Sequence, residues 1–314
     1  MVSQESMLVT IVLCTHSLDN LQNLKQAVDS LLAQSYRDIE VIVVVDGNEK
    51  LGDKVTEIYK DNIRIVVLKE NVGLSGARNA GAREARGDVI AFFDDDAFAD
   101  EKWAESLVRT YEDGDAIAVG GKVLPVWLKG RPYYLPEEID WLVGVTNKGF
   151  AGESVVEVRN TYGPNMSFKR EVFDAIGFFS ERLGFAKRGA GYMQGEEAEF
   201  TLRMMSRFGK GVLYNPEAVV YHKIPPSKTK IKVLLRRSFY QGHSKASINR
   251  AGISLNTLDT EKSYLRALLF KYMPRRFRGI FSRGCAGEVV KLLMLACIIA
   301  SVGLGFVYGY LKRT

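Results

Sequence analysis

Three consecutive carboxylates close an apolar run, and their types and spacing suit metal chemistry. The residues from Val89 to Phe93 are apolar and are followed directly by Asp94, Asp95 and Asp96. A run that ends in this way is typical of a strand buried on both faces. Adjacent acids repel one another, and Mg²⁺ or Mn²⁺ takes carboxylate oxygens together with phosphate oxygens. We therefore predict a divalent metal and an anionic ligand at this strand end. The alternative is a solvated acidic turn.

A glycine-rich loop upstream of that strand is suited to an anion. The stretch from Gly73 to Asn79 includes Gly76 and Arg78 and is expected to be a loop that runs into a helix. Glycines let a backbone approach closely, the guanidinium offers a fork of donors, and a helix amino end favours negative charge. The alternative is an ordinary loop in which Arg78 forms a surface ion pair. A dinucleotide-binding site is not favoured, because no G-x-G-x-x-G follows a strand.

Alternating strands and helices are predicted to position these residues. Strands are expected at residues 8–14, 39–45, 63–68 and 89–94. That alternation favours a parallel sheet with helices on both faces. Ligands of such sheets bind beyond the carboxyl ends of the strands. We therefore expect Asp46, which follows the second strand, to share a crevice with the three aspartates.

Length and composition narrow the class of protein. The chain has 314 residues, of which 46% are hydrophobic and 25% charged, so it is long and apolar enough to fold around a core. Its three cysteines and three histidines favour neither a disulfide framework nor a zinc cluster. The net charge of +6 is modest, and we expect no nucleic-acid partner. The polar stretch from Met1 to Met7 does not resemble a signal peptide.

Several short motifs, taken together, resemble the donor half of family-2 glycosyltransferases with the GT-A fold. They are Asp46-Gly47, the run from Gly73 to Gly81, and Phe93-Asp94-Asp95-Asp96. The resemblance implies that Asp94 and Asp96 hold Mn²⁺ or Mg²⁺ against the diphosphate of a nucleotide sugar. It also implies a donor-site position for Asp95 and Arg78.

The same resemblance implies contacts with the nucleoside. Asp46 occupies the position of the acid that reads the nucleotide base, and Thr15 lies where the first strand's end meets uracil. The implied donor is therefore a UDP-linked sugar.

Motifs in the second half of the chain resemble the acceptor side of the same family. They are the segment from Tyr162 to Arg170 and the helix start from Gly195 to Arg203. The resemblance implies a catalytic base at Glu197, but the sequence has Glu where many members have Asp, so the choice between Glu196 and Glu197 stays open. A carboxylate within hydrogen-bond reach can deprotonate a sugar hydroxyl. The alternative is an acidic first helical turn favoured by the helix dipole.

Three further features have both a functional and a structural interpretation. His222 lies where some GT-A enzymes place a third metal ligand, although a lone histidine is often structural. The basic and aromatic stretch from Arg236 to Lys245 can bind a diphosphate or lipid phosphate, or form a solvated helix face. Aromatic residues between Lys122 and Val158 suit an acceptor-binding insertion or core packing. This insertion resembles the archaeal branch that adds glucuronate to glucosyl-dolichyl phosphate.

The last part of the sequence predicts a membrane anchor. The stretch from Leu292 to Leu311 contains 20 residues without charge, enough to cross about 30 Å of hydrocarbon as a helix. A buried core helix is the alternative. Basic residues precede the stretch, namely Lys271, Arg275, Arg276, Arg278, Arg283 and Lys291, and they outnumber Lys312 and Arg313 after it. This asymmetry predicts a single-pass cell-membrane protein whose catalytic domain is cytoplasmic.

These observations combine into one expected architecture. We predict a GT-A domain over residues 7–250, a basic amphipathic membrane-proximal segment over 251–288 and a transmembrane helix over 289–311. The expected activity is inverting, metal-dependent transfer of a sugar from a nucleotide diphosphate to a lipid-linked acceptor. One rival is a polyprenyl-phosphate sugar synthase, which has little need of a base. Another is a non-catalytic membrane scaffold that binds nucleotide sugar.

Overall fold

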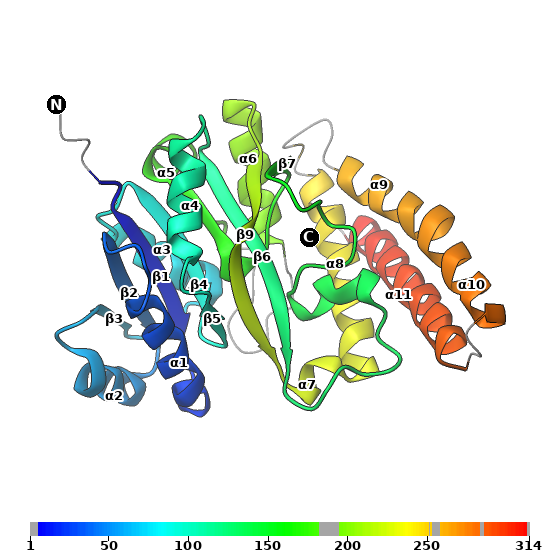
Figure 1. The fold of residues 1–314 in the computed structure, drawn as a ribbon, viewed down its shortest axis with the longest axis horizontal. Helices are drawn as coiled ribbons and strands as arrows, with labels where there is room; N and C mark the ends of the chain where they lie inside the picture. The colour runs from blue at the N-terminus through cyan, green and yellow to red at the C-terminus, as the bar shows by residue number, and fades with distance from the viewer. Residues whose placement is uncertain (1–5, 182–194, 251, 253–257, 283–285, 313–314) are drawn as a thin grey trace. The chain divides into compact units, whose positions relative to one another are not determined.

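The structure, a computed structural model, describes residues 6–181, 195–250, 252, 258–282 and 286–312. The chain divides into two compact units, drawn as ribbons in Figure 1. We call the first the sheet unit; it comprises residues 1–124, 151–191 and 196–222. The second, which we call the helical unit, comprises residues 125–150, 192–195 and 223–314.

One nine-stranded sheet has the order β3-β2-β1-β4-β8-β6-β9-β5, and β7 pairs with β9. Strands β1 to β4 are mutually parallel, which confirms the parallel sheet predicted from the alternation of elements. Beyond β4 the pairing becomes antiparallel, starting with β8. The strands are β1 Val9–Thr15, β2 Ile39–Asp46, β3 Arg64–Leu68, β4 Val89–Asp94, β5 Ala97–Ala99, β6 Ala118–Trp127, β7 Val156–Val158, β8 Met166–Lys169 and β9 Val212–Ile224.

Helices cover both faces of this sheet because its strands are apolar on both sides. Phe93 and alternate residues of β1 pack with α1 Leu21–Leu32, α2 Glu49–Tyr59 and α4 Trp103–Glu112. Phe92 packs on the other side with α3 Leu74–Glu84, α5 Arg170–Ile176 and α6 Glu196–Phe208. Successive strand residues point to opposite faces, so Val89 to Phe93 must be apolar throughout, as the sequence indicated.

The boundary before α3 differs from the prediction. Residues up to Asn79 were expected to form a loop, but the helix already begins at Leu74. Gly73 precedes it with φ of 85°, a left-handed conformation that glycine adopts without strain. Arg78 therefore lies inside the helix, one turn beyond its start. His222 lies within β9, a strand of 13 residues.

The helical unit is built around two closely packed helices, α8 Ile231–Arg250 and α11 Ala286–Leu311. A Cβ atom at Gly305 of α11 would lie 1.8 Å from the Phe239 carbonyl oxygen, so only glycine permits this approach. The unit also contains η2 Glu137–Val143, α7 Pro226–Thr229, α9 Asp259–Ala267, the π-helix η4 Leu268–Tyr272 and α10 Met273–Ser282. Within the described residues, α11 is the one helix long and apolar enough to cross a membrane.

Candidate active site

A buried arginine joins three carboxylates within the sheet unit. The Nη2 atom of Arg78 lies 3.4 Å from Oδ1 of Asp94, and its Nη1 atom lies 3.3 Å from Oε1 of both Glu196 and Glu197. Asp94 ends β4, and the two glutamates begin α6. Burial disfavours the charged form of Arg78, but the three carboxylates outweigh it and raise its pKa above the usual value. One cation thus compensates part of a negative cluster.

A glycine makes room for this arginine. A Cβ atom at Gly163 would lie 2.6 Å from Nη2 of Arg78 and 3.0 Å from Oε1 of Glu197. Gly163 begins the short helix η3 Gly163–Asn165, which Asn165 fixes in place by accepting a hydrogen bond from the Trp103 indole. Sequence reasoning placed this segment on the acceptor side without assigning a role to Gly163. The structure shows that any side chain there would displace the ion cluster.

The second aspartate of the run has partners of its own. Oδ2 of Asp95 accepts a hydrogen bond of 2.7 Å from the Thr15 hydroxyl and another of 3.2 Å from the Asn20 amide. The register that pairs Cys14 of β1 with Asp94 of β4 places Thr15 beside Asp95. Burial, only partly offset by these hydrogen bonds, raises the pKa of Asp95 to about 6. Asn20, which ends the short helix η1 Leu18–Asn20, had no sequence signal.

The third aspartate lies against the predicted histidine. Nε2 of His222 is 3.0 Å from Oδ1 of Asp96, and the histidine side chain is buried. This contact follows from strand register, because Ala97 of β5 pairs with His222 of β9. The structure therefore brings together two of the three residues predicted to hold a metal. The third, Asp94, ends β4 and has a partly exposed side chain.

Asp46 is buried at the end of β2 and holds the loop that precedes α3. Its Oδ1 atom accepts a hydrogen bond of 2.7 Å from the Val72 amide, and its Oδ2 atom accepts one of 3.0 Å from the Gly73 amide. Gly47, with φ of 67°, allows the turn, because a Cβ atom there would lie 2.2 Å from the Asn71 nitrogen. The carboxylate thus fixes the backbone beside the candidate donor site.

The partly buried Cys14 thiol shows that these groups lie near one another. Burial raises the pKa of Cys14 to about 12, and the charges that act on this thiol belong to Arg78, Asp94, Asp46 and Asp95. Cys14 lies on β1, between the β2 and β4 strand ends that carry the acids. The predicted common crevice at the carboxyl ends of the strands is therefore consistent with the electrostatics of the folded chain.

The two glutamates of α6 differ in exposure. The Glu196 side chain is 3% exposed, whereas that of Glu197 is 22% exposed. Adjacent residues of a helix point about 100° apart, so the side chains of Glu196 and Glu197 approach Arg78 from different directions. The partly exposed carboxylate of Glu197 is the more accessible of the two. The buried carboxylate of Glu196 is better placed to hold the arginine.

The donor set at the strand ends fits a divalent cation in part. Carboxylate oxygens and an imidazole nitrogen are ligands that Mn²⁺ accepts, and Asp96 and His222 already lie side by side. Among the described residues, no cluster of three or more His, Cys, Asp or Glu forms a complete metal site. Phosphate oxygens of a substrate would have to complete the coordination, as is common for Mg²⁺ and Mn²⁺ sites at phosphates.

Comparison with known proteins gives concordant matches. Residues 10–177 match the family model described as glycosyl transferase family 2. The chain is 40% identical over 309 residues to the glucosyl-dolichyl phosphate glucuronosyltransferase of Haloferax volcanii, covering 97% of each sequence.

Two solved structures are similar in fold. One is a mannosyltransferase from Pyrobaculum calidifontis in complex with GDP-Man and Mn²⁺, with a TM-score of 0.62 and 17% identity over 97% of this chain and 88% of that chain. The other is TarS of S. aureus in complex with UDP-GlcNAc, with a TM-score of 0.55 and 15% identity over 97% and 89%.

Proposed function

Because the chain belongs to glycosyltransferase family 2 and has the GT-A fold, we propose that it transfers glucuronate from a UDP-linked donor to a glucosyl-dolichyl-phosphate-type acceptor with inversion. The observation that carries this proposal is the 40% identity to a glucosyl-dolichyl phosphate glucuronosyltransferase along 97% of both chains. The partly exposed carboxylate cluster of the sheet unit supplies the groups that such a transfer needs.

We assign the base role to Glu197. Its carboxylate takes the proton from the acceptor hydroxyl as that oxygen attacks the anomeric carbon from the face opposite the leaving diphosphate. Both carboxylates contact Arg78 at 3.3 Å, and the partial exposure of Glu197 supports this choice over Glu196, which is buried. Arg78 acts as a positioning residue, because its guanidinium offsets the repulsion among Asp94, Glu196 and Glu197.

We propose that Asp94, Asp96 and His222 hold Mn²⁺ or Mg²⁺ beside the donor diphosphate. A divalent cation at this position neutralises the charge that develops on the leaving group. Asp95 and Thr15, joined by a hydrogen bond, form one wall of the donor site. Asp46 orders the loop that leads into α3, and its predicted contact with the nucleotide base is retained in this proposal.

The apolar helix α11 is proposed to anchor the enzyme in the cell membrane, with the catalytic domain in the cytoplasm. One side of this helix packs on α8, but apolar residues such as Leu293, Leu304 and Val307 are exposed. The basic residues counted upstream support this orientation, although Arg283 and Arg313 lie outside the described residues. We retain residues 7–250, 251–288 and 289–311 as catalytic domain, membrane-proximal segment and span.

Transfer of label from a panel of nucleotide sugars tests the proposal. Membranes that contain the full-length chain are incubated with labelled UDP-glucuronate, UDP-glucose or GDP-mannose and with a glucosyl-prenyl phosphate acceptor. We expect label in the lipid fraction from UDP-glucuronate alone, and its loss in the Glu197→Gln variant. Label on prenyl phosphate that lacks glucose would instead indicate a polyprenyl-phosphate sugar synthase. Absence of transfer from every donor would indicate a non-catalytic binding protein.

A further inference from the structure

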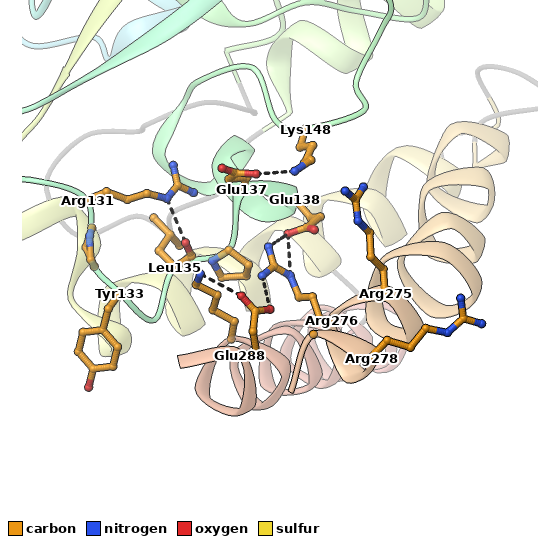
Figure 2. A pocket seen from close by; sticks show the side chains of 14 residues that line it. Arg131, Tyr133, Leu135, Glu137, Glu138, Lys148, Arg275, Arg276, Arg278 and Glu288 are labelled. Atoms are coloured by element: carbon orange, nitrogen blue, oxygen red, sulfur yellow. Dashed lines mark hydrogen bonds and ion pairs between the residues drawn. The ribbon is translucent and has the colours of Figure 1, made fainter. Parts of the chain in front are cut away.

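A basic pocket lies within the helical unit. The carboxylate cluster described above belongs to the other unit, the sheet unit. Its volume is about 480 Å³. Loop and η2 residues form one wall, and α10 with the start of α11 forms the other (Figure 2). Its positively charged lining residues are Arg131, Lys148, Arg275, Arg276, Arg278 and Lys291.

Part of this positive charge is already neutralised inside the pocket. Arg276 pairs with Glu138 at 2.6 Å and with Glu288 at 2.9 Å, two ion pairs visible in Figure 2. Lys148 pairs with Glu137 at 2.8 Å, and Lys291 lies 3.4 Å from Glu288. Three glutamates thus face six basic side chains across the cavity.

The remaining balance is positive. Arg131, the one pocket arginine on the loop wall, forms a two-pronged ion pair with Asp140, with contacts of 2.7 and 3.0 Å. When this carboxylate is included, six basic groups face four acidic ones, a surplus of two positive charges. Arg275 is exposed and forms no ion pair with any residue that the structure describes. Its guanidinium is therefore available to a ligand.

The chemistry of the walls indicates an amphipathic anion. Pro132 and the exposed ring of Tyr133 give the loop wall an apolar part opposite the arginines of α10, with the buried Leu135 behind them. A guanidinium fork matches the oxygens of a phosphate, and the apolar wall suits the first carbons of a hydrocarbon chain. A free inorganic anion would leave that wall unused.

The surroundings of the pocket indicate that the ligand comes from a membrane. Phe277 and Phe281 of α10 are 57% and 78% exposed, and their rings meet edge to face with centroids 5.4 Å apart. Exposed aromatic rings between basic residues are typical of a helix that lies at a lipid–water interface. The pocket opens on the same helix, so a lipid headgroup is the phosphate within its reach.

We propose that this pocket binds the phosphate group of a membrane lipid, with Arg275 as the principal ligand. The phosphate can belong to the prenyl phosphate part of the acceptor or to an anionic phospholipid such as phosphatidylglycerol. Arg276 and Arg131 shape the pocket through their ion pairs. The site stands independently of which sugar the enzyme transfers, because binding can be measured without turnover.

Calorimetric titration of the full-length chain in neutral detergent tests this site. The probes are citronellyl phosphate, a short prenyl phosphate, and short-chain phosphatidylglycerol, with citronellol as the uncharged reference. We expect saturable binding of at least one phosphate probe and weak binding of citronellol. The Arg275→Gln substitution should lower the affinity for the tighter-binding phosphate probe about tenfold, since one charge-assisted contact is lost.

The matched control is Arg266→Gln, which removes the same charge from exposed α9 outside the pocket lining. Its affinity for both probes should equal that of the unmodified chain. A preference for citronellyl phosphate, with a raised acceptor KM in Arg275→Gln, assigns the site to the acceptor. A preference for phosphatidylglycerol with an unchanged acceptor KM assigns it to bulk lipid. Equal losses in both variants, equally tight binding of citronellol, or no saturable binding would overturn the proposal.

Discussion

Each of the two units contains a charged cluster. The surplus charge is negative in the sheet unit and positive in the helical unit, but the two clusters are arranged alike. In the sheet unit, Arg78 is 2% exposed among three carboxylates. In the helical unit, the Glu138 side chain is 4% exposed and pairs with Arg276 in a pocket whose surplus is positive. In both clusters the most buried ion carries the minority sign. In the sheet unit, two of the three majority charges, Asp94 and Glu197, are left partly exposed, whereas Glu196 is buried.

This difference separates two roles for charge. A buried ion whose partners surround it contributes to the stability of the fold, because its removal leaves opposite charges desolvated and uncompensated. A surplus charge at the surface contributes to ligand binding and little to stability. The sheet-unit cluster therefore suits a cation together with a phosphorylated donor, and the helical-unit pocket suits an anion.

The largest effect on activity is expected when divalent cations are removed, which tests whether the carboxylates of the sheet unit act together with a metal. Excess chelator should abolish transfer, and Mn²⁺ or Mg²⁺ should restore it, because the surplus carboxylates cannot neutralise a leaving diphosphate themselves. The Asp96→Asn variant should be inactive while keeping an unchanged thermal unfolding midpoint. Initial rates with and without chelator measure the effect. Full activity in chelator would contradict a metal-dependent mechanism.

Removal of the minority ion in the sheet unit should damage the fold as well as the reaction. Arg78→Met leaves Asp94, Glu196 and Glu197 without their shared cation, and we expect a loss of about 3–5 kcal/mol in unfolding free energy. Denaturant unfolding in detergent measures it. Arg86→Met is the matched control, because that side chain is 73% exposed and should change stability by less than about 0.5 kcal/mol. Equal unfolding free energies of the two variants would show that Arg78 does not stabilise the fold by compensating the three carboxylates.

A surplus carboxylate should behave differently from the buried ones. Glu197→Gln keeps the size of the side chain and should lower turnover by about 10²–10⁴-fold without weakening donor binding. Glu196→Gln should chiefly lower the unfolding midpoint, because it removes a buried partner of Arg78. Single-turnover rates and donor titrations of the two variants separate these effects. The reverse ranking would move the base to Glu196.

The smallest effect is expected from the minority ion of the pocket. Glu138→Gln removes one partner of Arg276, but Glu288 remains 2.9 Å away, so we expect a loss of about 1–3 kcal/mol. Glu137→Gln serves as the control, because its side chain is 52% exposed and its pair with Lys148 lies at the surface. A larger loss of unfolding free energy in Glu137→Gln than in Glu138→Gln would show that the buried minority ion does not stabilise the pocket as Arg78 is expected to stabilise the sheet-unit cluster.

Local sequence patterns predicted the parallel half of the sheet well. Each of the strands β1 to β4 is a short, mostly apolar run between turn residues. Helices on both faces bury β1, β2 and β4, whereas β3 at the sheet edge is only partly buried. The start of α6 at Glu196 also followed from a local motif. These features depend on neighbouring residues in the chain, so periodicity and end signals are sufficient to find them.

The contacts that build the candidate site depend on residues far apart in the sequence. The pairing of Asp96 with His222 requires the register between β5 and β9, and the pairing of Asp95 with Asn20 requires a short helix without a motif. Arg78 was expected to offer its donors from a loop, but the helix begins earlier and turns it toward carboxylates 16 and 118 residues away. Its contact with a donor stays a prediction.

The close approach of α8 and α11 constrains the sequence of the proposed anchor. Gly305 meets the backbone of Phe239, and a Cβ atom at Gly242 would lie 2.0 Å from the Val302 carbonyl oxygen. Ser301 adds a hydrogen bond of 2.8 Å to the Leu235 carbonyl. A helix that only has to dissolve in lipid can be exchanged for any apolar sequence of equal length. This one cannot, because its rotation and its position along α8 are set by glycines at the contact, so the proposed anchor is also a structural part of the helical unit.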